Sequence, residues 1–232
     1  MFRRYACFAL LACASMIGMA ADQISIKEVS EKTGRKIKDV KQSDVPGWYE
    51  AYGDGGMFYV NDKLTHIFSG VVFDIATKKN LTRARVEALK LVDVTNLPIA
   101  DGIRMRRGGA ARKVFIYSDP NCTYCRMLES ELAKIDNVDL VILPYPILSK
   151  DSEILAHEIL CASDRAKAWR EWMLFKRRPG RGGCDVSLGK ILESGRKHEV
   201  RATPTLIFDD GSRLTGMVEV AEIERKFSSM PR

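Results

Sequence analysis

The stretch FIYSDPNCTYC, residues 115–125, is the part of the sequence that decides the fold. It continues an apolar run that begins at Lys113 and ends at Ser118, and such a run predicts a buried β-strand. The turn-forming residues 119–121 follow, and residues 122–134 then have the apolar spacing of an α-helix. We therefore expect a strand-to-helix turn that places a Cys-x-x-Cys motif at the start of a helix.

A cysteine at the first turn of a helix is suited to nucleophilic chemistry. The thiolate is the reactive form of cysteine, and unpaired backbone N–H groups together with the positive end of the helix dipole stabilise it. Cys122 is therefore the predicted nucleophile. Cys125, one helical turn later, is placed to resolve a mixed disulfide by attacking the sulfur of Cys122. The intervening Thr123 and Tyr124 are expected to tune the reduction potential.

Two further interpretations of the cysteine motif are open. It can be half of a zinc site, which requires two further ligands. The histidines of the chain are poor candidates, because His66, His157 and His198 are not paired at ligand spacing. It can also be an inert structural disulfide, although a tight loop at a helix start is an uncommon position for one. We favour a redox-active pair with no metal and no cofactor.

The first residues predict export from the cytoplasm. Residues 1–20 have the parts of a signal peptide: two arginines, an apolar run at residues 6–17, and the small residues Gly18 and Ala20. We expect cleavage after Ala20 or Ala21. The alternative is a lipoprotein anchored through Cys13, but the sequence stays apolar after this cysteine, whereas a lipoprotein normally turns polar there.

Composition excludes several classes of protein. The chain has 232 residues, 46% of them hydrophobic and 29% charged, which is the balance of an ordinary globular protein. Its formal net charge of +7 is too weak an excess to indicate binding to nucleic acid. Without the signal peptide four cysteines remain, and an oxidising compartment then permits two disulfides. The Cys-x-x-Cys motif uses one pair, which leaves Cys161 with Cys184.

The remaining sequence predicts two parts. Short apolar runs alternate with turn signals over residues 47–74, as in an antiparallel meander, and a helical pattern begins at Asn80. Residues 101–112 are rich in glycine and arginine, which predicts an exposed joint and a boundary near residue 100. The second part then shows an α/β pattern with a mixed sheet. Its later predicted elements are strands at 138–143, 205–208 and 213–216, and helices within 152–176, 187–197 and 220–227.

The motif at 115–125, taken with Ala202-Thr203-Pro204-Thr205 downstream, resembles the thioredoxin fold and in particular the bacterial DsbC/DsbG group of disulfide isomerases. The second cysteine pair points to DsbC. The resemblance implies an α/β fold, α+β overall: a thioredoxin-like domain with a helical insertion, preceded by a small cystatin-like α+β dimerisation domain and a helical linker. The implied limits are a signal peptide at 1–20, a dimerisation domain at 21–80, a linker helix and joint at 81–103, and a catalytic domain at 104–232.

The resemblance also implies roles for individual residues. Thr203-Pro204 is expected to be a cis peptide that faces the cysteines and, with Thr123 and Tyr124, contacts substrate. Cys161–Cys184 is expected to be a structural disulfide, and closing its loop stabilises by roughly 3 kcal/mol. Asp119 either adjusts the proton affinity of the site or caps the following helix.

The function implied by the resemblance is that of a periplasmic protein disulfide isomerase or reductase. Its partners are misfolded or disulfide-bonded exported proteins, a second copy of the chain in a homodimer, and a membrane reductant of the DsbD type. Three competing functions stay open: a dithiol oxidant on the same scaffold, a DsbG-like reductase, and a non-enzymatic chaperone for unfolded exported chains.

Overall fold

The computed structural model describes residues 24–180 and 183–230. The predicted signal peptide and Cys13 lie outside these residues. The chain divides into two compact units, Met1–Val86 and Glu87–Arg232, and each is described by itself. Within the described residues no helix is long and apolar enough to cross a membrane.

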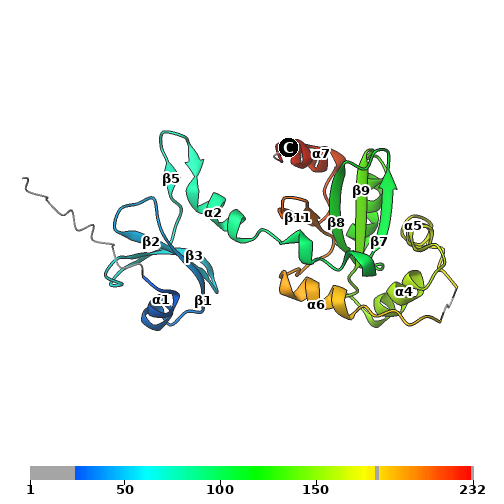
Figure 1. Ribbon diagram of the computed structural model, residues 1–232, viewed down its shortest axis with the longest axis horizontal. Helices are drawn as coiled ribbons and strands as arrows, with labels where there is room; N and C mark the ends of the chain where they lie inside the picture. Colours follow the sequence, from blue (N-terminus) through cyan, green and yellow to red (C-terminus); the bar gives the residue numbers. More distant parts are fainter. Residues whose placement is uncertain (1–23, 181–182, 231–232) are drawn as a thin grey trace, which may run out of the picture. The chain divides into compact units, whose positions relative to one another are not determined.

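The first unit is a four-stranded antiparallel sheet with a helix packed against it (Figure 1). A second hairpin leads from this sheet into helix α2. The elements are α1 (Ile26–Thr33), β1 (Ile37–Gln42), β2 (Trp48–Gly53), β3 (Gly56–Asn61), β4 (Ile67–Phe68), β5 (Phe73–Asp74), β6 (Lys79–Asn80) and α2 (Leu81–Leu89).

The sequence pattern predicted the meander of this unit but not its first two elements. Helix α1 begins with a capping box in which the Ser25 side chain accepts from the Glu28 N–H and the Glu28 carboxylate accepts from the Ser25 N–H. This pattern was visible in the sequence as Ser-x-x-Glu. Val29 of α1 is fully buried and belongs to the same core as Ala51 and Phe58 of the sheet.

The second unit is built on a five-stranded mixed sheet in the order β11-β10-β8-β9-β7. Strands β8 and β9 are parallel neighbours, with Phe115 opposite Val141, and the other pairs are antiparallel. The strands are β7 (Ile103–Arg107), β8 (Arg112–Ser118), β9 (Val138–Pro144), β10 (Thr205–Phe208) and β11 (Arg213–Thr215). The predicted α/β layout with a mixed sheet is confirmed.

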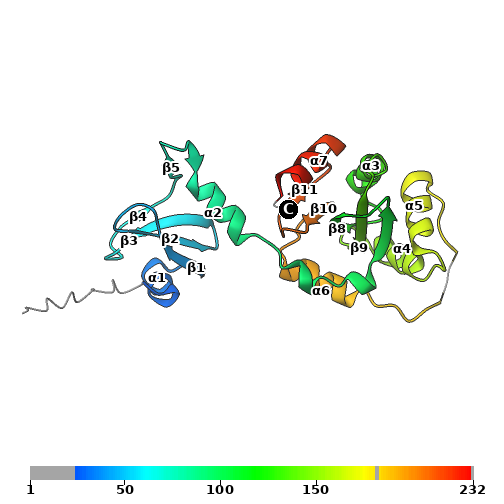
Figure 2. The ribbon, with the colours of Figure 1, turned by 45° about the horizontal axis from the view of Figure 1, so that its top comes forward.

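Helices cover both faces of this sheet, because alternate side chains of a strand point to opposite faces. Val114 and Ile116 pack in one core with α3, α4, α5 and α7, whereas Phe115 and Tyr117 pack in a second core with α6. Figure 2 shows α3 and α7 on one side and α6 on the other. The helices are α3 (Thr123–Leu132), α4 (Lys150–Leu160), α5 (Arg165–Phe175), α6 (Gly189–Lys197) and α7 (Val220–Ser229).

The prediction that residues 101–112 form an exposed joint is wrong. Residues 103–107 are the edge strand β7, in which Ile103 and Met105 are buried while Arg104 and Arg106 are exposed. Arg104 donates to both carboxylate oxygens of the buried Asp139, and this contact lowers the pKa of Asp139. Arg104 and Arg106 therefore lie on one face of a strand, opposite the buried Ile103 and Met105. The composition of residues 101–112 does not show this alternation.

Candidate active site

Cys122 lies where the turn after β8 meets the first residue of α3. It is the N-cap of the helix, and its Sγ accepts a hydrogen bond from the Cys125 N–H at 3.3 Å. Cys122 is 5% exposed, so most of the residue is shielded from solvent. The helix N-terminus and this N–H group both favour negative charge on Sγ.

The segment before β10 lies against the same sulfur. The Thr203–Pro204 peptide bond is cis, and the Cys122 thiol donates to the Thr203 carbonyl oxygen at 3.3 Å. Strand β10 holds this segment in place because Thr205 pairs with Tyr117 of β8. The structure thus brings together residues that are 81 positions apart in the sequence.

The second cysteine of the motif has a different environment. Cys125 is 1% exposed, and both Cys122 and Cys125 are free thiols in the structure. Burial raises the pKa of Cys125 to about 12, although a hydrogen bond with the Ser118 side chain opposes the shift. Because burial disfavours a thiolate, Cys125 is held as a protonated thiol.

The two residues between the cysteines face solvent. Tyr124 is 62% exposed and Thr123 is also exposed, at the first turn of α3. They are therefore accessible to a molecule that approaches Cys122.

Asp119 does not cap α3, so the capping role expected for it is wrong. Cys122 itself occupies the cap position, and the buried Asp119 carboxylate accepts three backbone N–H groups instead. The donors are Asn121 at 2.8 Å, Ile147 at 2.8 Å and Leu148 at 2.9 Å. Asp119 therefore ties the turn before Cys122 to the loop that follows β9.

The helical insertion also holds this turn, and sequence reasoning missed these contacts. The Trp172 indole N–H donates to the Pro120 carbonyl oxygen at 2.7 Å, and the Asn121 amide donates to Asp151 at 2.9 Å. Arg178 donates to the other oxygen of Asp151 at 3.0 Å. These two donors lower the pKa of Asp151, with Asn121 the larger cause. No local sequence signal marks contacts between residues so far apart in the chain.

A second carboxyl group is buried one turn beyond Cys125. Glu129 is 4% exposed and accepts a hydrogen bond from the Trp169 indole N–H at 2.5 Å. Burial raises the pKa of Glu129 to about 6, because the charged form loses its hydration. This contact joins α3 to α5.

The remaining cysteines form a disulfide between Cys161 and Cys184, with their Cα atoms 5.5 Å apart. It joins the end of α4 to the segment before α6. Across residues 24–180 and 183–230, no group of three or more His, Cys, Asp or Glu side chains is arranged to hold a metal ion.

Comparisons with known proteins place this geometry in a family. The family model described as a thioredoxin-like domain matches residues 101–230, and the one described as the disulfide bond isomerase protein N-terminal domain matches residues 18–83. A probable thiol:disulfide interchange protein DsbC from Bordetella pertussis is 34% identical over 206 residues, which are 89% of this chain and 74% of the relative. The chain belongs to the DsbC family.

More distant relatives agree with this assignment. The thiol:disulfide interchange protein DsbC of Escherichia coli K12 is 24% identical over 213 residues, covering 90% of this chain and 88% of the relative. A crystal structure of a disulfide interchange protein from Neisseria gonorrhoeae has 33% sequence identity and a TM-score of 0.53, covering 56% of this chain and 97% of that one. The predicted DsbC resemblance and the thioredoxin-like fold class are therefore confirmed.

Proposed function

We propose that this DsbC-family protein is a disulfide isomerase of the periplasm, which attacks wrong disulfides in exported proteins with the Cys122 thiolate. One observation carries the proposal: the Cys122 sulfur lies at a helix N-terminus against the Thr203 carbonyl oxygen, while its partner Cys125 stays buried and protonated. In this proposal the helix N-terminus assists the attack by the Cys122 thiolate, and the buried Cys125 thiol slows the step that completes the exchange.

The mixed disulfide between Cys122 and the substrate can be resolved in two ways, by isomerisation or by reduction. The Cys122 thiolate attacks one sulfur of a substrate disulfide, forms a mixed disulfide, and releases the other sulfur as a thiolate. In isomerisation a substrate thiolate attacks elsewhere and finally displaces Cys122 unchanged. In reduction Cys125 loses its proton and attacks the Cys122 sulfur, which releases a reduced substrate. The high pKa of Cys125 slows reduction and gives the substrate time to rearrange.

Substrate contacts belong to the same proposal. Thr203 offers its backbone to an extended chain beside the cis-bonded Pro204, and Thr123 and Tyr124 line the other side of the nucleophile. The geometry that supports these roles is the contact between the Cys122 thiol and Thr203, together with the exposure of Tyr124. The role of Cys161–Cys184 in this proposal is to stabilise the insertion.

The proposed assembly is a homodimer formed through the first unit. Support comes from the match of residues 18–83 to the isomerase N-terminal domain and from large apolar side chains that are exposed in β4, in β5 and in the segments that follow these strands. An exposed apolar cluster of this kind is typical of an interaction surface. Its members are Ile67, Phe68, Val71, Phe73 and Ile75.

The proposed pathway uses the signal peptide for export and a DsbD-type membrane protein to keep the Cys122–Cys125 pair reduced. An isomerase needs such a reductant because the compartment is oxidising, whereas a dithiol oxidant needs the pair oxidised. A DsbG-like reductase and a chaperone that binds without exchange are the two remaining competing functions, and the following experiment separates them.

Refolding of a scrambled, multiply disulfide-bonded ribonuclease tests the proposal. Catalytic amounts of the reduced protein should restore ribonuclease activity, and Cys122→Ala should not. Cys125→Ala should keep part of the isomerase activity and accumulate the mixed disulfide. If Cys122→Ala restores activity as well as the parent does, the protein acts as a chaperone; if the parent only reduces the substrate, it is a reductase.

A further inference from the structure

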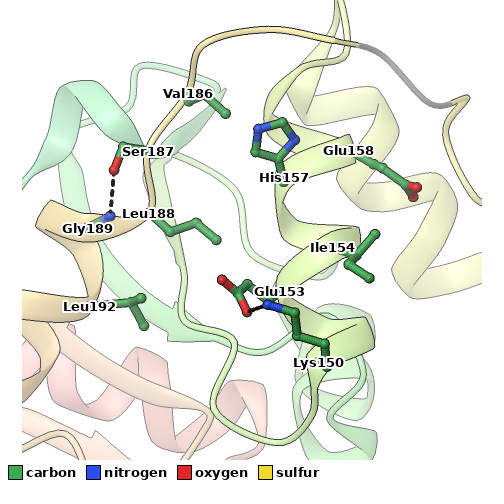
Figure 3. A pocket seen from close by; sticks show the side chains of 10 residues that line it. All are labelled: Lys150, Glu153, Ile154, His157, Glu158, Val186, Ser187, Leu188, Gly189 and Leu192. Atoms are coloured by element: carbon green, nitrogen blue, oxygen red, sulfur yellow. Dashed lines mark hydrogen bonds and ion pairs between the residues drawn. The ribbon is translucent and has the colours of Figure 1, made fainter.

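A cavity of about 750 Å³ lies between α4 and the segment that enters α6 (Figure 3). Its walls combine apolar side chains, among them Ile154, Leu188 and Leu192, with the charged pair Lys150–Glu153. His157 extends from α4 into the gap toward Val186. None of these residues takes part in the exchange chemistry described above for Cys122.

The same histidine contacts the second cysteine pair. Its Nδ1 lies 3.7 Å and its Nε2 4.0 Å from the Sγ atom of Cys161, which is bonded to Cys184. Cys184 is exposed and Cys161 is half-buried. The imidazole of His157 thus lies between an open cavity and a disulfide of which one end faces solvent.

We propose that Cys161–Cys184 is a second thiol-exchange site, open to low-molecular-weight thiols, with His157 as its proton donor. This goes beyond the structural role expected for the disulfide and does not depend on the reaction of Cys122. The thiolate of the small molecule attacks the exposed Cys184 sulfur, since access decides which sulfur of a disulfide is attacked. A mixed disulfide forms on Cys184, the Cys161–Cys184 bond breaks, and its electron pair leaves with the Cys161 sulfur.

The departing sulfur needs a proton because of its position. Cys161 is the C-cap of α4, where the free carbonyl groups and the negative end of the helix dipole disfavour a thiolate. His157, one turn earlier in the same helix, is within reach to donate that proton. A second small thiol then attacks the small-molecule sulfur of the mixed disulfide, and the Cys184 sulfur is released as a thiol. The products are two protein thiols and one small-molecule disulfide, so electrons and protons balance.

The experiment uses the full mature chain with Cys122→Ala and Cys125→Ala, so that Cys161–Cys184 is the single disulfide present. Free cysteine is the probe, and peptide mapping after acid quench follows the mixed disulfide on Cys184. The expected rate is proportional to the cysteine concentration and unchanged by low urea. The substitution His157→Gln should slow it about a hundredfold, which is the lower end of what proton donation contributes. The matched control Glu153→Gln, on the same cavity wall, should leave it unchanged.

Two outcomes overturn the proposal. One is a rate independent of the cysteine concentration that rises steeply with urea, because the disulfide then reacts only after global unfolding. The other is an equal rate in His157→Gln and the parent. Melting temperatures of all variants separate loss of folding from loss of proton transfer, and the urea series on the parent decides the first point even if His157→Gln is unstable.

Discussion

Each of the two cysteine pairs has one member at the end of a helix, and the two helix ends have opposite polarity. Cys122 is the N-cap of α3, where a backbone N–H group points at its sulfur. Cys161 is the C-cap of α4, where carbonyl groups end the helix. Helix polarity therefore favours a thiolate at Cys122 and disfavours one at Cys161. The same type of side chain is a free thiol in one place and half of a disulfide in the other.

The largest expected effect is the loss of isomerase activity when the Cys122–Cys125 pair, rather than the Cys161–Cys184 pair, is altered. Cys122→Ala removes the nucleophile, so isomerase activity should fall at least about a thousandfold, the scale of losing a covalent catalyst. The measurement is the initial rate of scrambled ribonuclease refolding. Residual activity within tenfold of the parent would show that the reaction does not begin at Cys122.

Removal of the other pair should affect stability instead. Cys161→Ala with Cys184→Ala opens a closed loop and should lower the free energy of unfolding by roughly 3 kcal/mol. Urea unfolding measures this loss, and the isomerase rate of the folded variant serves as its control. A folded variant that has lost its isomerase activity would contradict the separation of the two pairs.

Glu129 connects the two cysteine pairs. It lies on α3, the helix that begins after Cys122, and it accepts a hydrogen bond from Trp169, which lies in the loop that Cys161–Cys184 closes. Its pKa is raised from 4.5 to about 6, so ionisation is less favourable in the folded protein than in the unfolded chain. The contribution of Glu129 to stability is therefore lost as pH rises from about 4.5 to 6. Glu129→Gln should be more stable than the parent by about 2 kcal/mol at pH 7, with the difference vanishing below pH 4.

Urea unfolding at the two pH values checks this prediction, with Glu153→Gln on the exposed side of α4 as the matched control. The Gln side chain keeps an acceptor for the Trp169 N–H, so the comparison isolates the charge. A parent that is the more stable protein at pH 7 would show that the charged carboxylate is well compensated.

The smallest expected effect concerns Asp151, an exposed side chain whose hydrogen bonds connect the regions of the two cysteine pairs. Asp151 joins Asn121, next to the nucleophile, to Arg178 in the disulfide-closed loop. Asp151→Asn keeps the size of the side chain and weakens both contacts, and exposed ion pairs contribute little. We expect the alkylation rate of Cys122 to change by about twofold. A change above tenfold would mean that the insertion controls the nucleophile.

Much of the second unit could be predicted because its signals are local. The run at 115–125 predicted the strand, the turn and the helix of the nucleophile. The elements from residue 138 onward followed from their apolar spacing. The roles of Cys122 and Cys125 stay predictions that the variants above will test, and the roles of Thr203 and Pro204 stay predictions as well.

Some elements and contacts could not be predicted from the sequence, mostly for physical reasons. At 103–107 the buried Ile103 and Met105 alternate with arginines, and the arginine content concealed a strand. In the first unit the capping box at Ser25 and Glu28 was overlooked. The Asp119 carboxylate accepts hydrogen bonds from the N–H groups of residues 147 and 148, and the Glu129 carboxylate accepts one from Trp169. These partners are distant in the sequence and are brought together by tertiary packing, so no local pattern predicts them.

The redox state of the two pairs in intact cells tests the central claim most directly. Acid quench, thiol alkylation and peptide mapping count Cys122–Cys125 and Cys161–Cys184 separately. An isomerase kept reduced by a membrane partner predicts that Cys122–Cys125 is mostly in the dithiol form while Cys161–Cys184 is mostly bonded. A Cys122–Cys125 pair found mostly oxidised would contradict it and indicate a dithiol oxidant on the same scaffold.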